Sequence, residues 1–268
     1  MNKFIAYLAL LVAIAAGVTW YQLRGREAVA PIATSVPKAA RADDSWLSDL
    51  YSQNPRDTEK GTAKVTALGS KALPQIQATL RDPASEHNHR RAALRAAGIL
   101  GAAAEPALPE VAAALPDPEL TADAAAALSF MGPKALEPLR RAVTSDQAIV
   151  RRESLRSIGK LRFRAPLPST EVLPLLLDAM PDTDPTVRTV AATYLGILHE
   201  DPPASIPLLT AALEDPDPAV RRASATALGA FGGEATPALP ALKKAAADQD
   251  QDLAREAGRA IVNISGGK

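Results

Sequence analysis

"DPDPAVRRASATALGAFGGEATPALPAL", residues 215–242, restates a stretch that begins 33 residues earlier, "DTDPTVRTVAATYLGILHEDPPASIPLL", residues 182–209. Apolar, arginine, glycine and proline positions follow in the same order in both stretches. Self-similarity at such a period is typical of repeat proteins, in which each unit packs only against its neighbours. The match therefore predicts a stack of similar units.

An apolar position marks the first half of each unit. It recurs, with one histidine among its members, at His89, Leu120, Val150, Val187, Val220 and Leu253. A second apolar position follows eight residues after each of these, at Ala97, Leu128, Ile158, Leu195, Leu228 and Ile261. Because this spacing keeps both positions on one helical face, with small residues between them, the pattern predicts closely packed helices. Glycines that follow the second position are expected to ease the turn at the helix end; they are Gly98, Gly159, Gly196 and Gly229.

Prolines predict the start of a second helix in each unit. They recur in apolar stretches at Pro74, Pro109, Pro138, Pro174, Pro207 and Pro240. The first turn of a helix tolerates proline because the missing N–H has no intrahelical partner there. Asp-Pro pairs predict the joins between units, where the aspartates are expected to cap the next helix; they begin at Asp82, Asp117, Asp184, Asp215 and Asp217.

These motifs resemble HEAT repeats, and in particular the HEAT-like repeats of the bilin-lyase-related (PBS-lyase) type. The resemblance rests on the Asp-Pro turn, the Val-Arg-Arg start, the alanine stripe and the Leu-Gly end of "DPDPAVRRASATALGAFG". It implies an all-α fold, a right-handed α-solenoid of about six helix pairs over residues 55–248. A closing helix is expected at 253–264 and a capping helix at 45–53, so the predicted solenoid domain is 45–268.

Composition limits the classes of function. Hydrophobic residues make up 47% of the 268 residues but aromatic ones only 4%, which suits helices packed through alanine and leucine. Lys plus Arg and Asp plus Glu both total 30, so the net charge predicts no general affinity for nucleic acid. The chain has no cysteine, which excludes disulfides and thiol chemistry.

The N-terminus, residues 1–21, predicts a transmembrane or signal helix. Its uncharged stretch from Phe4 to Tyr21 is about 27 Å long as a helix, close to the thickness of the bilayer core. A cleaved signal peptide with Lys3 as its basic region is the alternative. Short anchors of this kind usually leave the bulk of the chain outside the cytoplasm. The predicted localisation is therefore a single-pass membrane protein with a periplasmic solenoid, tethered by an Ala/Pro-rich linker at 22–44.

Arginines follow the first apolar position in four units, at Arg90, Arg151, Arg188 and Arg221. In HEAT-like repeats such arginines commonly pair with aspartates between the units. The resemblance therefore implies a structural ladder of ion pairs along the stack, in preference to a ligand site.

The fourth unit departs from the pattern. It has 24 residues between Val150 and Pro174, where the fifth has 20 between Val187 and Pro207, and the extra stretch "GKLRFRAPLPST" is expected to form a loop. Eight basic residues oppose two acidic ones between Arg140 and Arg164, a local charge of +6. Acidic residues dominate the segment that follows, at Glu171, Asp178, Asp182, Asp184, Glu200 and Asp201.

Insertions in solenoids often lie on the binding face, so this region is the predicted partner-binding site. Its candidate residues are Arg140, Arg141, Arg152, Arg156, Lys160, Arg162, Phe163 and Arg164. A solvated face combined with the ladder is the alternative interpretation. Nucleic acid is disfavoured because the other solenoid aromatics, Phe130, Tyr194 and Phe231, occupy expected core positions.

No catalytic motif is present, and His87 and His89 beside Glu86 form at most a weak metal pair. We therefore expect no enzyme, no cofactor, no metal and no small-molecule substrate. The predicted function is a membrane-anchored HEAT-repeat scaffold in the cell envelope that binds a protein partner. An enzyme or enzyme subunit related to the bilin lyases and a purely structural envelope spacer are the alternatives.

Overall fold

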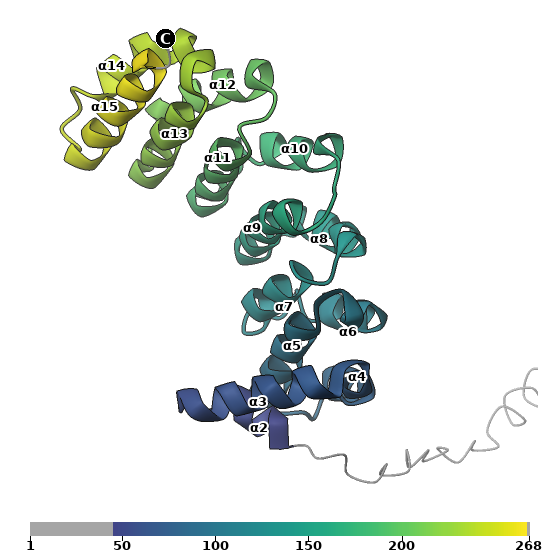
Figure 1. Cartoon of the computed structure of the whole chain (residues 1–268). Coiled ribbons are helices and arrows are strands. Elements are labelled where there is room, and N and C mark those ends of the chain that lie inside the picture. The colour runs from purple at the N-terminus through teal and green to yellow at the C-terminus, as the bar shows by residue number, and fades with distance from the viewer. Residues whose placement is uncertain (1–44, 267–268) are drawn as a thin grey trace, which may run out of the picture. The chain divides into compact units, whose positions relative to one another are not determined.

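The computed structural model describes residues 45–266, and its secondary structure in that range is entirely helical (Figure 1). A short helix, α2 (Ser45–Tyr51), precedes a series of helix pairs. The pairs are α3 (Pro55–Leu68) with α4 (Leu73–Arg81), α5 (His87–Leu100) with α6 (Leu108–Ala113), α7 (Thr121–Leu128) with α8 (Leu136–Ala142), α9 (Ala148–Arg164) with α10 (Ser169–Asp178), α11 (Pro185–Leu198) with α12 (Pro202–Ala211), and α13 (Pro218–Ala230) with α14 (Leu239–Ala245). Helix α15 (Gln251–Gly266) closes the series. The predicted all-α repeat architecture is confirmed.

Helices pack in two rows. The first helices of the units contact one another in chain order, from α5 through α7, α9, α11 and α13 to α15, while the second helices lie together in a parallel row (Figure 1). Each unit thereby covers the apolar faces of its neighbours.

The core lies between the two rows and contains the repeated apolar positions. Val187, Leu195 and Leu228 are at most 1% exposed, and the corresponding residues of most other units are buried to a similar extent. Few of the buried side chains are aromatic, so alanine and leucine fill most of the core, as the composition predicts. His89, the exception in the series, is half-buried and packs edge-on against Tyr51, with the ring centroids 5.5 Å apart.

Gly98, Gly196 and Gly229 lie in the last turns of α5, α11 and α13, near the helix ends as predicted, whereas Gly159 lies inside α9. None of the four has a positive φ, so the expected role in the exit turn is wrong. A Cβ added at Gly196 of α11 would lie 2.5 Å from the Cα of Ala227 in α13, and one at Gly229 would lie 3.0 Å from the Cα of Ala260 in α15. These glycines therefore let consecutive first helices approach backbone to backbone. The turn after α5 begins instead at Gly101, whose φ of +57° favours glycine.

Prolines open several second helices as predicted, with Pro74, Pro109 and Pro240 in the first turns of α4, α6 and α14. Pro174 and Pro207 are exceptions, because they lie inside α10 and α12. These two helices begin a turn earlier, where the other four units have a 3₁₀ segment instead.

The predicted membrane localisation is contradicted. Among residues 45–266, no helix is both long enough and apolar enough to cross a bilayer. The longest helix of that range, α9, has 17 residues and carries arginine or lysine along its length. The segments expected to form the anchor and the linker, residues 1–21 and 22–44, lie outside the described residues.

Candidate functional site

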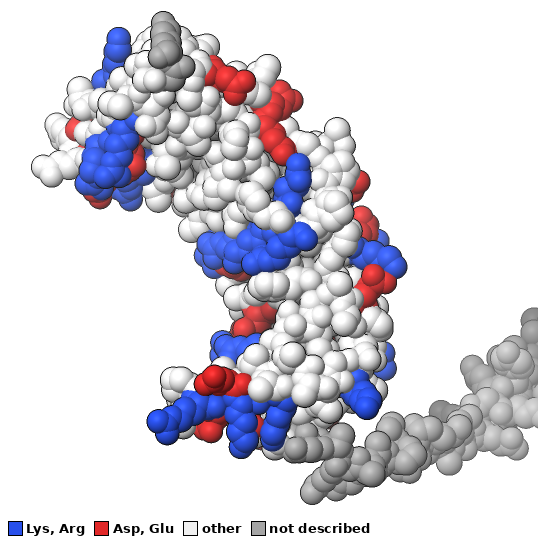
Figure 2. All heavy atoms as spheres, in the orientation of Figure 1, with Lys and Arg blue, Asp and Glu red and all other residues white. Residues whose placement is uncertain are grey.

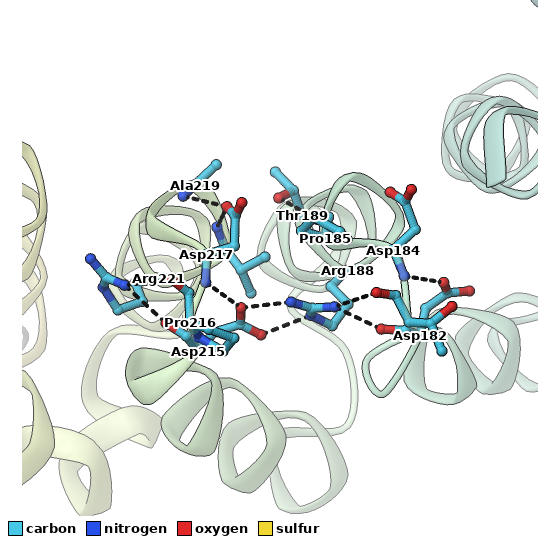
Figure 3. A network of polar contacts seen from close by, with 12 residues as sticks. Asp182, Asp184, Pro185, Arg188, Thr189, Asp215, Pro216, Asp217, Ala219 and Arg221 are labelled. Atoms are coloured by element: carbon cyan, nitrogen blue, oxygen red, sulfur yellow. Dashed lines mark hydrogen bonds and ion pairs between the residues drawn. The ribbon is translucent and has the colours of Figure 1, made fainter.

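The arginine ladder joins consecutive units through largely buried ion pairs (Figure 3). Arg188 of α11 donates from Nε and Nη2 to the two carboxylate oxygens of Asp215, at 2.8 and 2.7 Å. The same guanidinium donates from Nη1 to the backbone carbonyl of Asp182 at 2.8 Å. Arg151 of α9 holds Asp182 with the same fork geometry, at 2.8 and 2.7 Å. The predicted ladder is confirmed at these two joins.

Each of these joins contains two aspartates, one that pairs with the arginine and one that caps the next helix. Asp215 receives the arginine and also accepts a hydrogen bond from the backbone N–H of Asp217 at 2.8 Å, while Asp217 caps α13 by accepting from the N–H of Ala219 at 2.8 Å (Figure 3). Asp182 and Asp184 divide the same tasks at the start of α11. The expected helix capping is therefore confirmed for Asp184 and Asp217. Asp215 was also expected to cap a helix, but it pairs with Arg188 in the ladder instead.

Ion pairing sets the ionisation of these carboxylates. The hydrogen bond from Arg151 holds the pKa of Asp182 below its ordinary value against the opposing effect of burial. Burial is the largest influence on Asp215 and raises its pKa, but Arg188 and the N–H of Asp217 together outweigh it and the pKa is lowered. The same pairs raise the pKa of both arginines, so the ladder stays charged at neutral pH.

The ladder is weaker elsewhere. Arg90 reaches Asp117 at 3.4 Å, and Arg221 lies 3.8 Å from Asp250. Thr121 and Ser145 occupy the arginine and aspartate positions of the join between α7 and α9, so this join lacks both partners of a rung.

The predicted partner-binding residues lie on two helices in different rows. Arg140 and Arg141 belong to α8, where Arg140 pairs with Glu171 at 3.3 Å and Arg141 with Glu137 at 2.9 Å. The remaining six candidates belong to α9. The expected loop is wrong at this point, because the first six residues of "GKLRFRAPLPST" extend α9 to Arg164.

The acidic segment neutralises part of the basic region. Glu171 reaches back to α8, Asp182 holds Arg151, and Glu200 pairs with Arg162 at 2.8 Å. The excess charge inferred from the sequence therefore overstates the charge that is free to attract a partner.

One face of α9 carries Arg152, Arg156, Lys160, Phe163 and Arg164, which we call the α9 surface. Spacings of three and four residues place these side chains on the same side of the helix. Basic side chains gather over α9 in the space-filling view (Figure 2). The Phe163 side chain is 61% exposed.

Buried Glu153 organises two members of the α9 surface. Its carboxylate receives Arg152 at 2.8 Å and Arg156 at 3.1 Å. Tyr194 of α11 lies against Gly159 of α9, and its ring occupies the space that a Cβ at position 159 would need. Burial raises the pKa of the Tyr194 phenol. The Glu153 carboxylate therefore holds both Arg152 and Arg156 in place, but it offsets only one of their two charges.

Phe130 was expected in the core, but it is 46% exposed at the end of α7. The Arg164 guanidinium carbon lies 4.0 Å from its ring centroid, a cation–π contact. Arg164 and Lys160 have no carboxylate partner among residues 45–266. The repeat separates the two positions. Phe130 lies two residues after Leu128, where exposed Ala230 follows Leu228, whereas buried Phe231 lies three residues after Leu228, at the position of buried Met131.

The histidine pair does not assemble a metal site. His87 lies 3.6 Å from Asp117 and 3.3 Å from Glu119, while the His89 ring packs against Tyr51. In the described part of the chain, no group of three or more potential ligands is placed to hold a metal ion.

Comparison with known proteins agrees with this architecture. The family model for HEAT repeats matches residues 106–196, 141–212 and 173–261, which together cover more than half of the 268 residues. The chain therefore belongs to the HEAT-repeat family. None of the curated proteins that were compared matches it.

Solved structures show a similar fold at low sequence identity. Importin beta is similar with a TM-score of 0.58 at 15% identity, over 83% of this chain and 33% of that one. The complex of CpcE and CpcF of phycocyanin lyase from Nostoc sp. has a TM-score of 0.48 at 23% identity, over 58% of this chain and 98% of that one. A computationally designed armadillo repeat protein for modular peptide recognition has a TM-score of 0.45 at 16% identity, over 82% and 99%.

Proposed function

We propose that this HEAT-repeat chain is a protein-binding scaffold and that the α9 surface is its docking site. The observation that carries the proposal is the combination of two cations without a carboxylate partner in the described range, Lys160 and Arg164, with the exposed ring of Phe163. Arginine and aromatic side chains are enriched among the residues that contribute most to protein interfaces.

The scaffold supports this assignment physically. The arginine ladder and the backbone contact between α11 and α13 hold neighbouring units in fixed relation, so α9 presents its side chains from a rigid element. A preorganised surface loses less conformational entropy when it binds. The α9 surface favours a partner with an acidic face, because its own cations outnumber Glu153.

Photo-crosslinking tests the proposal. A photoreactive amino acid replaces Phe163 in the full chain, expressed in its natural host, and the matched control replaces Val262 of α15, which is 67% exposed. We expect a protein adduct at position 163 only, whose partner is identified by mass spectrometry and binds again as a purified protein. Equal adducts at both positions, or none, would contradict the proposal.

The alternatives predict different outcomes. A structural spacer gives no specific adduct at position 163. An enzyme turns over a substrate, and replacing Lys160 and Arg164 with glutamate leaves that turnover unchanged. The statement that the chain is not an enzyme stays a prediction.

A further inference from the structure

An open groove of about 550 Å³ lies between α5 and α7. Small residues form its floor: Gly98, Ala126 and Ala127. Its far end is formed by Ile99 and the half-exposed ring of Phe130. Helix α7 has the sequence TADAAAAL, so no long side chain from it fills the space beside α5. We call this hollow the α7 groove.

A second hollow of about 730 Å³ continues the α7 groove along α5. The two share Arg95 and Asp123 in their linings, and the second extends to Asn88 and the polar residues Ser52 and Gln53. From Asn88 to Ile99 the path follows α5 for about 16 Å, the length of about five extended peptide residues. The surface is thus long enough for a peptide and apolar at one end.

Some charged side chains along this path have an ion-pair partner and others do not. Asp123 is neutralised by Arg91, whose Nε lies 2.9 Å from its carboxylate. Arg95 has no ion pair among the described residues and donates from Nη1 to the carbonyl of Leu50. Arg164, which stacks on Phe130 at 4.0 Å, also lacks a carboxylate there. Two guanidinium groups without carboxylate partners in the described range are therefore near the apolar floor: Arg95 lines the groove, and Arg164 stacks on the Phe130 ring at its end.

We propose that the α7 groove binds a peptide segment of a protein partner in which acidic residues lie on either side of an apolar side chain. The apolar side chain packs on Ala126 between Ile99 and Phe130, and the carboxylates pair with Arg95 and Arg164. This inference rests on the proposed protein-binding function and adds the chemistry of the segment that is recognised. Arg164 belongs to the α9 surface and also stacks on Phe130 of the α7 groove, so the two sites are adjacent.

Direct binding of a defined probe tests the proposal. The probe is a fluorescein-labelled peptide of sequence Glu-Glu-Leu-Phe-Glu-Glu, and its control has lysine in place of every glutamate. Fluorescence anisotropy with the full chain is expected to show saturable binding of the acidic probe, weakened several-fold at high salt, and at least tenfold weaker binding of the basic probe. Equal affinity for both probes would overturn the proposal.

Matched variants locate the binding. Ala126→Leu fills the exposed floor of the groove, whereas Thr226→Leu places the same side chain at the corresponding exposed position of α13. We expect at least a tenfold loss of affinity for Ala126→Leu and less than a twofold change for Thr226→Leu, with both melting as wild type does. Arg95→Glu provides a second variant, with a similar loss expected. Unchanged affinity in Ala126→Leu and Arg95→Glu would overturn the proposal, as would a change in oligomeric state that accounts for the loss.

Failure of this inference is distinguishable from failure of the proposed function. Ala126→Leu leaves the side chains of the α9 surface in place, so a crosslinked partner at position 163 together with unchanged probe binding would remove the groove alone. Probe binding that Ala126→Leu abolishes, without any partner at position 163, would retain the groove and remove the α9 docking site.

Discussion

Replacing Arg188 with glutamine tests the ladder most severely, because this residue makes the best-formed rung. Its guanidinium donates twice to Asp215, at 2.8 and 2.7 Å, and also to the carbonyls of Asp182 and Thr183, at 2.8 and 3.2 Å. The two charged side chains are 13% and 10% exposed. Arg188→Gln therefore leaves the Asp215 carboxylate largely buried without its partner.

The magnitude follows from that burial. Breaking a fully buried ion pair costs about 3–5 kcal/mol and an exposed one about 0.2–1 kcal/mol. The Arg188 pair lies nearer the buried limit, so we expect Arg188→Gln to lower the free energy of unfolding by about 2–3 kcal/mol. The control is Arg255→Gln, since Arg255 is 52% exposed and its ion pairs among residues 45–266 are with Asp252 and Glu256 of its own helix. Arg255→Gln is therefore expected to leave the free energy of unfolding nearly unchanged.

Urea unfolding followed by circular dichroism measures both variants. Hydrogen exchange adds a local readout, because amides of α11 and α13 should lose protection before those of α5. Equal losses for Arg188→Gln and Arg255→Gln would refute the argument that the ladder couples the units.

Three further predictions concern packing, capping and acid stability. Gly196→Ala should lower the free energy of unfolding by about 1–3 kcal/mol, because the added Cβ meets the backbone of α13. A Cβ at Gly258 meets no atom within 4 Å, so Gly258→Ala should raise the free energy of unfolding by about 0.5–1 kcal/mol. Equal effects of the two variants in urea unfolding would contradict the close approach of α11 and α13. Asp217→Ala removes the cap of α13 and should cost about 1 kcal/mol, with faster hydrogen exchange in the first turn of that helix; unchanged exchange there would argue against the cap. Because the folded-state pKa values of Asp182 and Asp215 are lowered, their stabilisation is present above the unfolded pKa of about 4 and is lost as pH falls through the folded values. Urea midpoints measured from pH 6 to pH 2 should therefore fall on the acid side, and a flat profile would count against these pairs.

The repeat made much of the fold predictable from the sequence. Val187 and Leu195 recur with a helical spacing, and both are buried as that spacing requires. Arg188 and Asp215 lie 27 residues apart, and only the repeat resemblance indicated that they pair. The buried positions and the ion pairs can be predicted because the repeat period and the residue types recur several times in one chain.

Other features depend on contacts that the period does not encode. Gly196 lies near the end of α11 as expected, but the reason for glycine there is the close backbone of α13, which the sequence alone does not show. The residues after Lys160 extend α9 by further turns because the chain continues with helix-forming side chains up to Arg164 and meets Pro166 only afterwards.

Charge counting along the sequence selected the candidate residues on α9, but it missed the contacts that they make with other units. Glu200 neutralises Arg162 across a join between units, and Phe130 lies under Arg164 from the preceding unit. Both contacts join residues more than thirty positions apart in the chain, as the separations of 38 and 34 residues show. Local charge counting therefore does not show which of these cations lack a carboxylate partner among residues 45–266.

The most direct test of docking at the α9 surface is the affinity of the purified partner for a charge-reversed chain. Lys160→Glu with Arg164→Glu reverses its two cations that lack a carboxylate partner in the described range, and Lys243→Glu reverses an exposed lysine of α14. Titration calorimetry should show at least a tenfold weaker Kd for the double variant, with the Lys243→Glu chain within twofold of wild type. An unchanged Kd in a double variant that melts normally would contradict docking at the α9 surface.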